Sequence, residues 1–330
     1  MNTSTIRTAL CAGTLAALAA GTAGAETLRL SHQFSDNDVR HQIAQMIADE
    51  VAAAGVDLEL QIFPNQTLFK AREQYTPLSR GQLDMTVLPL SYAGGQQPAY
   101  NLTLMPGLVR NLDHGDRLSH SPFMEKLEEI MAEDDVMVLV HGYLAGGFGS
   151  NKGCITRPED VKGVTIRAAG KSFEEMLAGA GASISSMASS EIYPALQTGV
   201  LDATNTSSES FVSFRLYEQL DCYTPAGDTA LWFMYQPMLI NKTTFDGLTP
   251  EQQAALTEAA TKAEAYYLEE GKKGDQVARE TFESAGVEIA EMTPEDFDAW
   301  LALAKETAFP IFVEETPNGQ ELLDMALAVE

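Results

Sequence analysis

Positive charge is scarce in this sequence. It contains 21 Lys and Arg against 47 Asp and Glu, for a formal net charge of −26. Nucleic acid and anionic membranes would repel such a chain, so neither is an expected partner. Acidic side chains on solvated helix faces are the simplest source of the imbalance. An anionic ligand would need a local group of cations inside this repelling field.

Motifs of catalysis and metal binding are missing as well. The sequence contains no HExxH, no GxSxG and no phosphate-binding loop. Its five histidines show no spacing typical of metal ligands, and its acidic pairs fall on expected helix faces or ends. We therefore predict no catalytic residue, no metal site and no cofactor.

Cysteine is rare. Two of the three cysteines, Cys154 and Cys222, lie beyond the first 25 residues. In an oxidising compartment such a pair favours a disulfide over a nucleophile. Two separate buried thiols are the alternative, because the sequence does not reveal how close their Cα atoms lie. We predict the disulfide.

Long apolar runs are absent, since a membrane span needs ~20 residues and no uncharged apolar run is that long. A shorter run at 9–20 follows Arg7 and precedes a small-x-small sequence ending at Ala25. This pattern is typical of a secretory signal peptide. We predict export to a bacterial periplasm with cleavage after Ala25. Cleavage removes one cation, Arg7, and no anion, so the net charge becomes −27.

The length that remains indicates two lobes, because single cores usually stop growing at about 250–300 residues. Strand-like and helix-like segments alternate, with "TLRLSHQF" followed by a helical pattern at 36–54, and "LDMTVLPL" by one at 122–133. A second set begins at "GVTIRAAG", after the glycine-rich "HGYLAGGFGSNKG". Such alternation is the signature of α/β folds with mostly parallel sheets.

A charged helical pattern at 249–285 is too long for one small lobe, with only Gly271 and Gly274 interrupting it. We expect one helix across both lobes, kinked near these glycines. The lobes would share the chain through short crossings near Tyr143 and Tyr235. The predicted division is 26–143 with 235–272 for the first lobe, and 144–234 with 273–330 for the second.

One cation stands out. In "PEDVKGVTIRAAG", Arg167 ends an apolar strand-like run where a glycine-containing loop begins. A guanidinium offers a planar pair of donors that matches a carboxylate, and it stays charged when it is desolvated. A structural bridge to a nearby helix or loop is the alternative on spacing alone.

The order of several segments resembles a known family over nearly the whole chain beyond Ala25. The segments are "IFPNQTLFKAREQYTPLSRGQLDMTVLPLSYAG", "LTLMPGL", "NKGCITRPEDVKGVTIRAAG" and "SSEIYPALQTGVLDATN". Together they resemble the DctP-type solute-binding proteins of tripartite ATP-independent periplasmic (TRAP) transporters. The resemblance implies a type II-like two-lobe periplasmic binding protein, monomeric and not an enzyme. It would close on a small organic acid and deliver it to TRAP membrane permease subunits.

The resemblance also implies site residues. The arginine of the family's "KGxxIR" strand pairs with the ligand carboxylate, and here that residue is Arg167. Asn205 and Thr206 match a turn whose asparagine binds ligand in relatives, and the displaced asparagine leaves the choice between them open. Gln33 matches a polar ligand contact of sialic-acid-binding relatives, and Lys70 and Tyr92 lie in first-lobe segments that face the cleft in the family. Ser189, a further candidate, falls where some relatives place an aromatic residue.

The chain departs from the family where sugar-acid-binding relatives have a second arginine, because Gly146 and Gly147 stand there. Trp232, Phe233 and Tyr235 form a second set of candidates at the interlobe crossing. A single arginine, Arg167, together with these three aromatic residues favours a compact monocarboxylate ligand with an apolar or aromatic body. The alternative places these aromatics in the lobe core and leaves the polar candidates to hold a C4-dicarboxylate. Two other functions compete with transport. The protein could act as a ligand sensor for a signalling partner, or as a periplasmic hydrolase or lyase.

Overall fold

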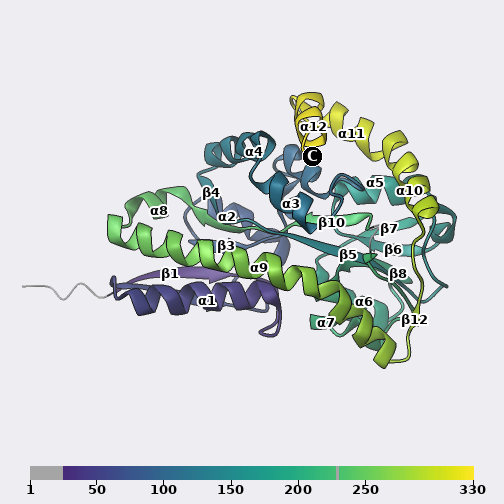
Figure 1. The fold of residues 1–330 in the computed structure, drawn as a ribbon, viewed down its shortest axis with the longest axis horizontal. Helices are drawn as coiled ribbons and strands as arrows, with labels where there is room; N and C mark the ends of the chain where they lie inside the picture. The colour runs from purple at the N-terminus through teal and green to yellow at the C-terminus, as the bar shows by residue number, and fades with distance from the viewer. Residues whose placement is uncertain (1–24, 228–229) are drawn as a thin grey trace, which may run out of the picture.

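A computed structural model describes residues 25–227 and 230–330 (Figure 1). The predicted signal peptide therefore lies outside the described residues, apart from Ala25 at its end. No helix within the described ranges combines the length and the apolar character that crossing a membrane requires.

The first sheet has five strands in the order β2-β1-β3-β11-β4. β1 pairs in parallel with β2 and β3, whereas β11 is antiparallel to both β3 and β4. The strand bounds are β1 Glu26–Ser31, β2 Leu58–Phe63, β3 Met85–Val87, β4 Val136–Val140 and β11 Met238–Asn241. One strand that arrives late in the chain, β11, therefore completes a sheet begun at the N-terminus.

Helix α1 (Val39–Ala54) confirms the helical pattern predicted at 36–54 and covers this sheet. The Asp38 side chain caps its first turn by accepting from the Arg40 N–H, and Gly55 ends it with φ of 66°. Ile43 and Ile47 lie one turn apart on its apolar face and are fully buried with the sheet residues.

The second sheet has the order β12-β9-β5-β8-β6-β7, with β10 paired to β5. Its strands are β5 Tyr143–Ser150, β6 Thr165–Ala168, β7 Ser183–Ser186, β8 Ala203–Ser207, β9 Cys222–Thr224, β10 Trp232–Tyr235 and β12 Glu288–Ile289. The prediction of mostly parallel sheets was wrong in this detail. The sheets are mixed, because β5 and β11, which carry the chain from one sheet to the other, pair antiparallel with all their neighbours.

The remaining helices surround these sheets (Figure 1). They are α2 Tyr75–Ser79, α3 Leu112–Ser119, α4 Pro122–Glu133, α5 Lys171–Gly179, α6 Ile192–Gln197, α7 Ser208–Ser213, α8 Lys242–Gly247, α10 Pro294–Glu306, α11 Ala308–Glu315 and α12 Gly319–Leu327. Short 3-10 turns are η1 Ala71–Glu73, η2 Leu90–Ala93, η3 Pro98–Leu104, η4 Pro158–Val161, η5 Ser189–Glu191 and η6 Leu216–Glu218. The C-terminal helices contact both halves of the fold, since α11 packs on α5 and α12 on α4.

Helix α9 (Pro250–Ser284) is the long helix predicted at 249–285 (Figure 1). Its first half buries Leu256 and Tyr267 in the core of the first sheet, and its last turns bury Phe282 in a cluster beside the second sheet. The helix is continuous through both glycines, which allow close packing. A Cβ at Gly271 would lie 3.1 Å from Leu144 of β5, and one at Gly274 would meet the Glu209 carboxylate.

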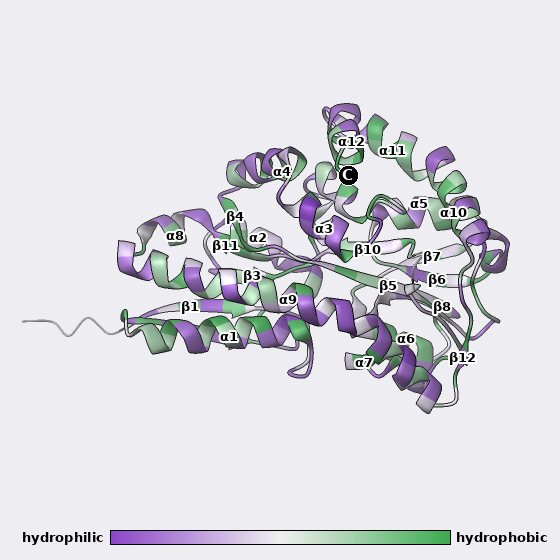
Figure 2. Cartoon of the chain, viewed as in Figure 1, coloured by the Kyte–Doolittle hydropathy of each residue, from purple (hydrophilic) through white to green (hydrophobic). Residues whose placement is uncertain are grey.

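Apolar side chains fill the space between these layers. Figure 2 shows helices α1 and α9 with apolar and polar residues alternating around the helix, as expected for elements buried on one face. The loop after β5 is joined to β9 by a disulfide between Cys154 and Cys222, whose Cα atoms are 5.3 Å apart.

Candidate ligand-binding site

Arg167 lies near the end of β6, between β7 and β8, and only 1% of its surface is exposed. Its Nε donates to the Met187 carbonyl at 3.0 Å and its Nη1 to the Asn205 carbonyl at 2.7 Å. Its Nη2 donates to the Tyr92 hydroxyl at 2.8 Å. A guanidinium has five N–H donors, so one donor on each terminal nitrogen is left for a further acceptor.

The positive charge of Arg167 has no counter-ion among the described residues. Its three acceptors are two carbonyls and a phenol, and no carboxylate within the described ranges forms a salt bridge with it. Burial lowers the pKa of Arg167. A buried charge is costly unless it is paired. Arg167 thus keeps a charge and two N–H donors that no described residue satisfies.

A second arginine, Arg72 in η1, lies beside the first. Its guanidinium carbon stacks 4.4 Å above the centre of the Tyr92 ring, and its Nη2 donates to the Met187 carbonyl at 3.1 Å. Burial acts to raise the pKa of Tyr92, but the charges of Arg167 and Arg72, together with hydrogen bonds to its hydroxyl, lower this pKa overall. The sequence reasoning chose Lys70, which is exposed, and missed Arg72 in the same segment.

Tyr92 and Gln33 connect the two sheets across this site. Tyr92, in η2 after β3, also accepts from the Ser189 backbone N–H at 3.0 Å. Gln33, which follows β1, accepts from the Ser190 hydroxyl at 3.2 Å through its side-chain oxygen. Elements of the first sheet thus hold the residues that follow β7, and the described conformation is closed over Arg167.

Several buried polar atoms around Arg167 have no hydrogen-bond partner among the described residues. Buried polar groups nearly always have partners, so such a group needs an explanation. A bound polar molecule would supply one. Among the residues that contact Arg167 or Tyr92, or neighbour them in sequence, the unpaired atoms are Gln33 Nε2, Arg72 Nε, Ser91 Oγ, Asn205 Oδ1 and Asn205 Nδ2.

The structure distinguishes between the two candidates of β8. Asn205 is fully buried, its carbonyl binds Arg167, and both polar atoms of its side chain are unpaired. Thr206 is the next residue, and alternate residues of a strand point to opposite faces. Its carbonyl lies against Gly146 of β5. Asn205 is therefore the residue that the geometry places at Arg167.

The three aromatic candidates do not form one cluster. Phe233 borders a surface hollow together with Gly271 of α9, and the Tyr235 hydroxyl bonds His141 Nδ1 at 2.6 Å. Trp232 points to the other face of β10, with its Cε3 2.6 Å from where a Cβ at Gly146 would be. The Trp232 ring and the Thr206 carbonyl fill the space of any side chain at Gly146, which explains why no arginine stands there.

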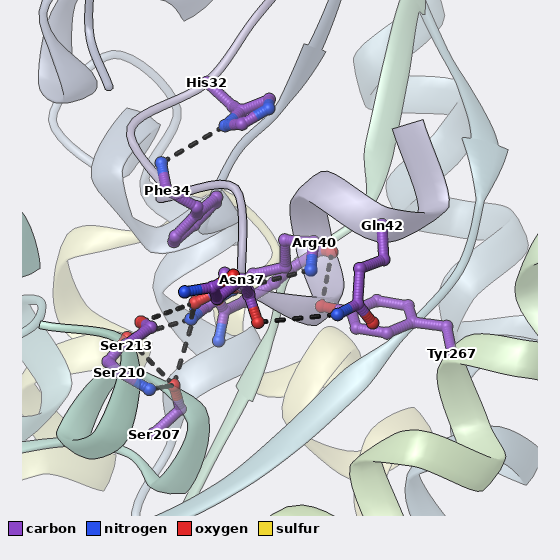
Figure 3. A network of polar contacts seen from close by, with 11 residues as sticks. His32, Phe34, Asn37, Arg40, Gln42, Ser207, Ser210, Ser213 and Tyr267 are labelled. Carbon is purple, nitrogen blue, oxygen red and sulfur yellow. Dashed lines mark hydrogen bonds and ion pairs between the residues drawn. The ribbon is translucent and has the colours of Figure 1, made fainter. Parts of the chain in front are cut away.

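A second buried arginine, Arg40, forms a network of polar contacts beside the segment between β10 and β11 (Figure 3). Arg40 of α1 is as buried as Arg167, but Asp38 pairs with it, and its Nε is 2.6 Å from Asp38 Oδ1. Its Nη2 donates to the Ser210 hydroxyl of α7 at 3.0 Å, and its Nη1 to the Gln236 side chain at 2.7 Å. This network ties α1 to α7 and to the segment between β10 and β11.

A hollow of about 540 Å³ lies beside this network, lined by residues of α1, α7 and α9. Its lysine, Lys273, is already paired with Glu270 at 2.7 Å. This hollow therefore differs from the surroundings of Arg167, whose described acceptors are all neutral.

Two sheets are joined by crossing strands and a shared helix, and they enclose the buried Arg167 beside the partly buried Arg72. This is the architecture of a two-lobe solute-binding protein. The sequence profile described as bacterial extracellular solute-binding protein, family 7 (DctP) matches residues 30–314. The chain belongs to this family, whose members serve TRAP transporters, and it is a receptor and not an enzyme.

Individual relatives agree with this assignment. A solute-binding protein of Albidiferax ferrireducens is 33% identical, with 91% of this chain and 90% of the relative covered. The 2,3-diketo-L-gulonate-binding periplasmic protein YiaO of Escherichia coli is 27% identical, with 94% of both chains covered. The crystal structure of a TRAP periplasmic solute-binding protein from Rhodoferax ferrireducens with bound malonate has a TM-score of 0.87. It is 33% identical and covers 91% of this chain and 96% of its own.

Proposed function

We propose that this protein captures a small organic acid between its two sheets, with the carboxylate on Arg167, and delivers it to a TRAP permease. The uncompensated charge of the fully buried Arg167 is the observation that carries this proposal. A carboxylate supplies the missing charge and accepts from the donors left on Nη1 and Nη2.

Arg72 changes the expected class of ligand. The sequence favoured an apolar monocarboxylate because only one arginine was identified and three aromatics were grouped together. A second cation, with the unpaired Nε2 of Gln33 and the unpaired side-chain amide of Asn205, supports a compact acid that carries another acidic or carbonyl group. The malonate bound to the Rhodoferax relative and the diketo acid bound by the Escherichia coli relative have this chemistry.

Finer expectations about the chain accompany this proposal. The receptor acts as a monomer after cleavage behind Ala25. Its lobes are residues 26–143 with 235–272 and residues 144–234 with 273–330. They close about the two neighbouring crossings, where the Gln236 N–H donates to the Gly142 carbonyl at 2.8 Å. Helix α9, which is buried in both halves, follows this motion.

Calorimetry with matched acids tests the ligand class. We expect malonate or a related dicarboxylate to bind at least tenfold more tightly than its monomethyl ester, because the ester cannot pair with a second cation. The variant Arg72→Met should remove most of this difference. If no organic acid binds, the function itself is wrong. If an aromatic monocarboxylate binds and no dicarboxylate does, Arg72 is not a ligand contact.

A further inference from the structure

A cluster of histidine and glutamate side chains lies on the first-sheet side of the fold, outside the Arg167 site. His120 ends α3, His141 lies between β4 and β5, and Glu264 belongs to α9. One ligand atom of each residue lies within 4.8 Å of the others. His120 Nε2 is 3.0 Å from Glu264 Oε1. Glu128 of α4 adds a carboxylate oxygen 3.4 Å from His141 Nε2.

Outer hydrogen bonds orient both imidazoles. His120 Nδ1 is 2.9 Å from the Asp116 carbonyl, which can only accept, so this nitrogen carries a proton. His141 Nδ1 is 2.6 Å from the Tyr235 hydroxyl. The Nε2 atoms of both rings are thus left to face the carboxylates. This arrangement, in which one ring nitrogen is held from outside and the other points inward, is the usual one for histidine metal ligands.

The contact between His120 and Glu264 needs a cation. When His120 is neutral, its Nε2 lone pair faces a carboxylate oxygen at 3.0 Å, and two acceptors repel unless a proton or a metal ion lies between them. The His141 N–H donates to the other oxygen of Glu264 at 2.7 Å, which holds this carboxylate in place.

We propose that His120, His141 and Glu264, with Glu128 as a fourth ligand, bind a divalent transition-metal ion of the Zn²⁺ type. Imidazole and carboxylate are ligands suited to Zn²⁺, and four-coordinate sites are the commonest. The His120 side chain is 52% exposed, which leaves an entry path, and the negative protein attracts cations. The spacing of these residues in the sequence gave no sign of a site, because four separate elements bring them together.

An occupied site would join α3, α4 and α9 to the first interlobe crossing, on which His141 lies. The bound ion therefore stabilises the first half of the fold next to the hinge without contacting the organic acid. This inference does not rest on the proposed ligand of Arg167, and it predicts that Zn²⁺ binding occurs with or without that ligand.

Calorimetry of the chelator-treated mature protein with Zn²⁺ tests the site. We expect one ion per chain, with binding at least tenfold weaker in His120→Gln and Glu264→Gln. His41→Gln is the matched control, because His41 is not part of this cluster and its Nδ1 lies 3.2 Å from His32 Nε2, and it should bind as wild type does. Circular dichroism checks that each variant is folded.

Substitution of Co²⁺ for Zn²⁺ adds an independent readout, because His and Glu ligation gives a visible d–d absorption band. The band should appear in the wild type and in His41→Gln and be absent from His120→Gln. The proposal is overturned if wild-type protein binds no Zn²⁺ at 100 μM, or if His120→Gln and Glu264→Gln bind as tightly as the control.

Discussion

The two fully buried arginines should respond to mutation in opposite ways. Arg40 has a protein carboxylate as its partner, at 2.6 Å, whereas the acceptors of Arg167 are all neutral. Arg40→Met leaves Asp38 buried and unpaired, which costs about 3–5 kcal/mol of folding stability. Arg167→Met removes a charge that the protein alone does not compensate, so its cost in the ligand-free protein should be smaller.

Affinity should show the reverse order. Removing one partner of a desolvated, hydrogen-bonded charge pair costs about 2–5 kcal/mol of binding free energy. At 1.4 kcal/mol per factor of ten, this loss of binding free energy raises the dissociation constant of Arg167→Met about 30- to 4,000-fold. Arg167→Lys should also bind poorly, because an ammonium does not reproduce the planar pair of donors.

Urea unfolding and calorimetry measure the two quantities on the same three proteins. Wild type, Arg40→Met and Arg167→Met should separate into a stable binder, a destabilised protein and a stable non-binder. The reasoning is refuted if Arg167→Met binds the acid within threefold of wild type. It is also refuted if Arg167→Met lowers the unfolding free energy as much as Arg40→Met does, because Arg167 would then be a structural bridge.

Three other predictions concern the rest of the chain. Burial raises the pKa of Glu209 to about 8 from its usual 4.5. The folded state therefore keeps this proton at pH values where the unfolded state has lost it, and its stability falls as pH rises from 4.5 towards 8. Relative to Glu209→Gln, the wild type should lose about 2 kcal/mol between pH 6.5 and 8 in urea unfolding, and parallel curves would contradict this. Cys154→Ala with Cys222→Ala should cost roughly 4 kcal/mol, because the disulfide closes a loop of 68 residues, and an unchanged unfolding midpoint would exclude this cross-link. Small-angle scattering should show a smaller radius of gyration with saturating ligand, whereas an unchanged profile would mean that the cleft is closed without it.

Much of the fold was predictable because local chemistry determines it. The cap at Asp38, the glycine after α1 and the capping box at Thr249 mark helix ends that are readable from the sequence. The strand pairing was less accessible. Whether two strands run parallel depends on where crossings such as β11 return, and that is decided by contacts between distant segments.

The structure brings part of the predicted set together. Tyr92 contacts Arg167 and Ser189, and Gln33 contacts Ser190. The family's strand motif had indicated Arg167. Arg72 was missed because the preceding Lys70 has the same charge, and only the geometry of η1 shows which side chain turns inward. The aromatics of β10 were grouped by proximity in sequence, whereas the alternation of the strand sends them to opposite faces.

The order of strands in the first sheet also constrains how the protein folds. β11 lies between β3 and β4, and it begins at Met238, after most of the second sheet. When the chain emerges N-terminus first, the edges of β3 and β4 therefore stay unpaired until Met238–Asn241 has also emerged. Most of the second sheet is available before the first is complete. Unpaired strand edges promote aggregation, so β3 and β4 carry this risk until β11 pairs with both of them.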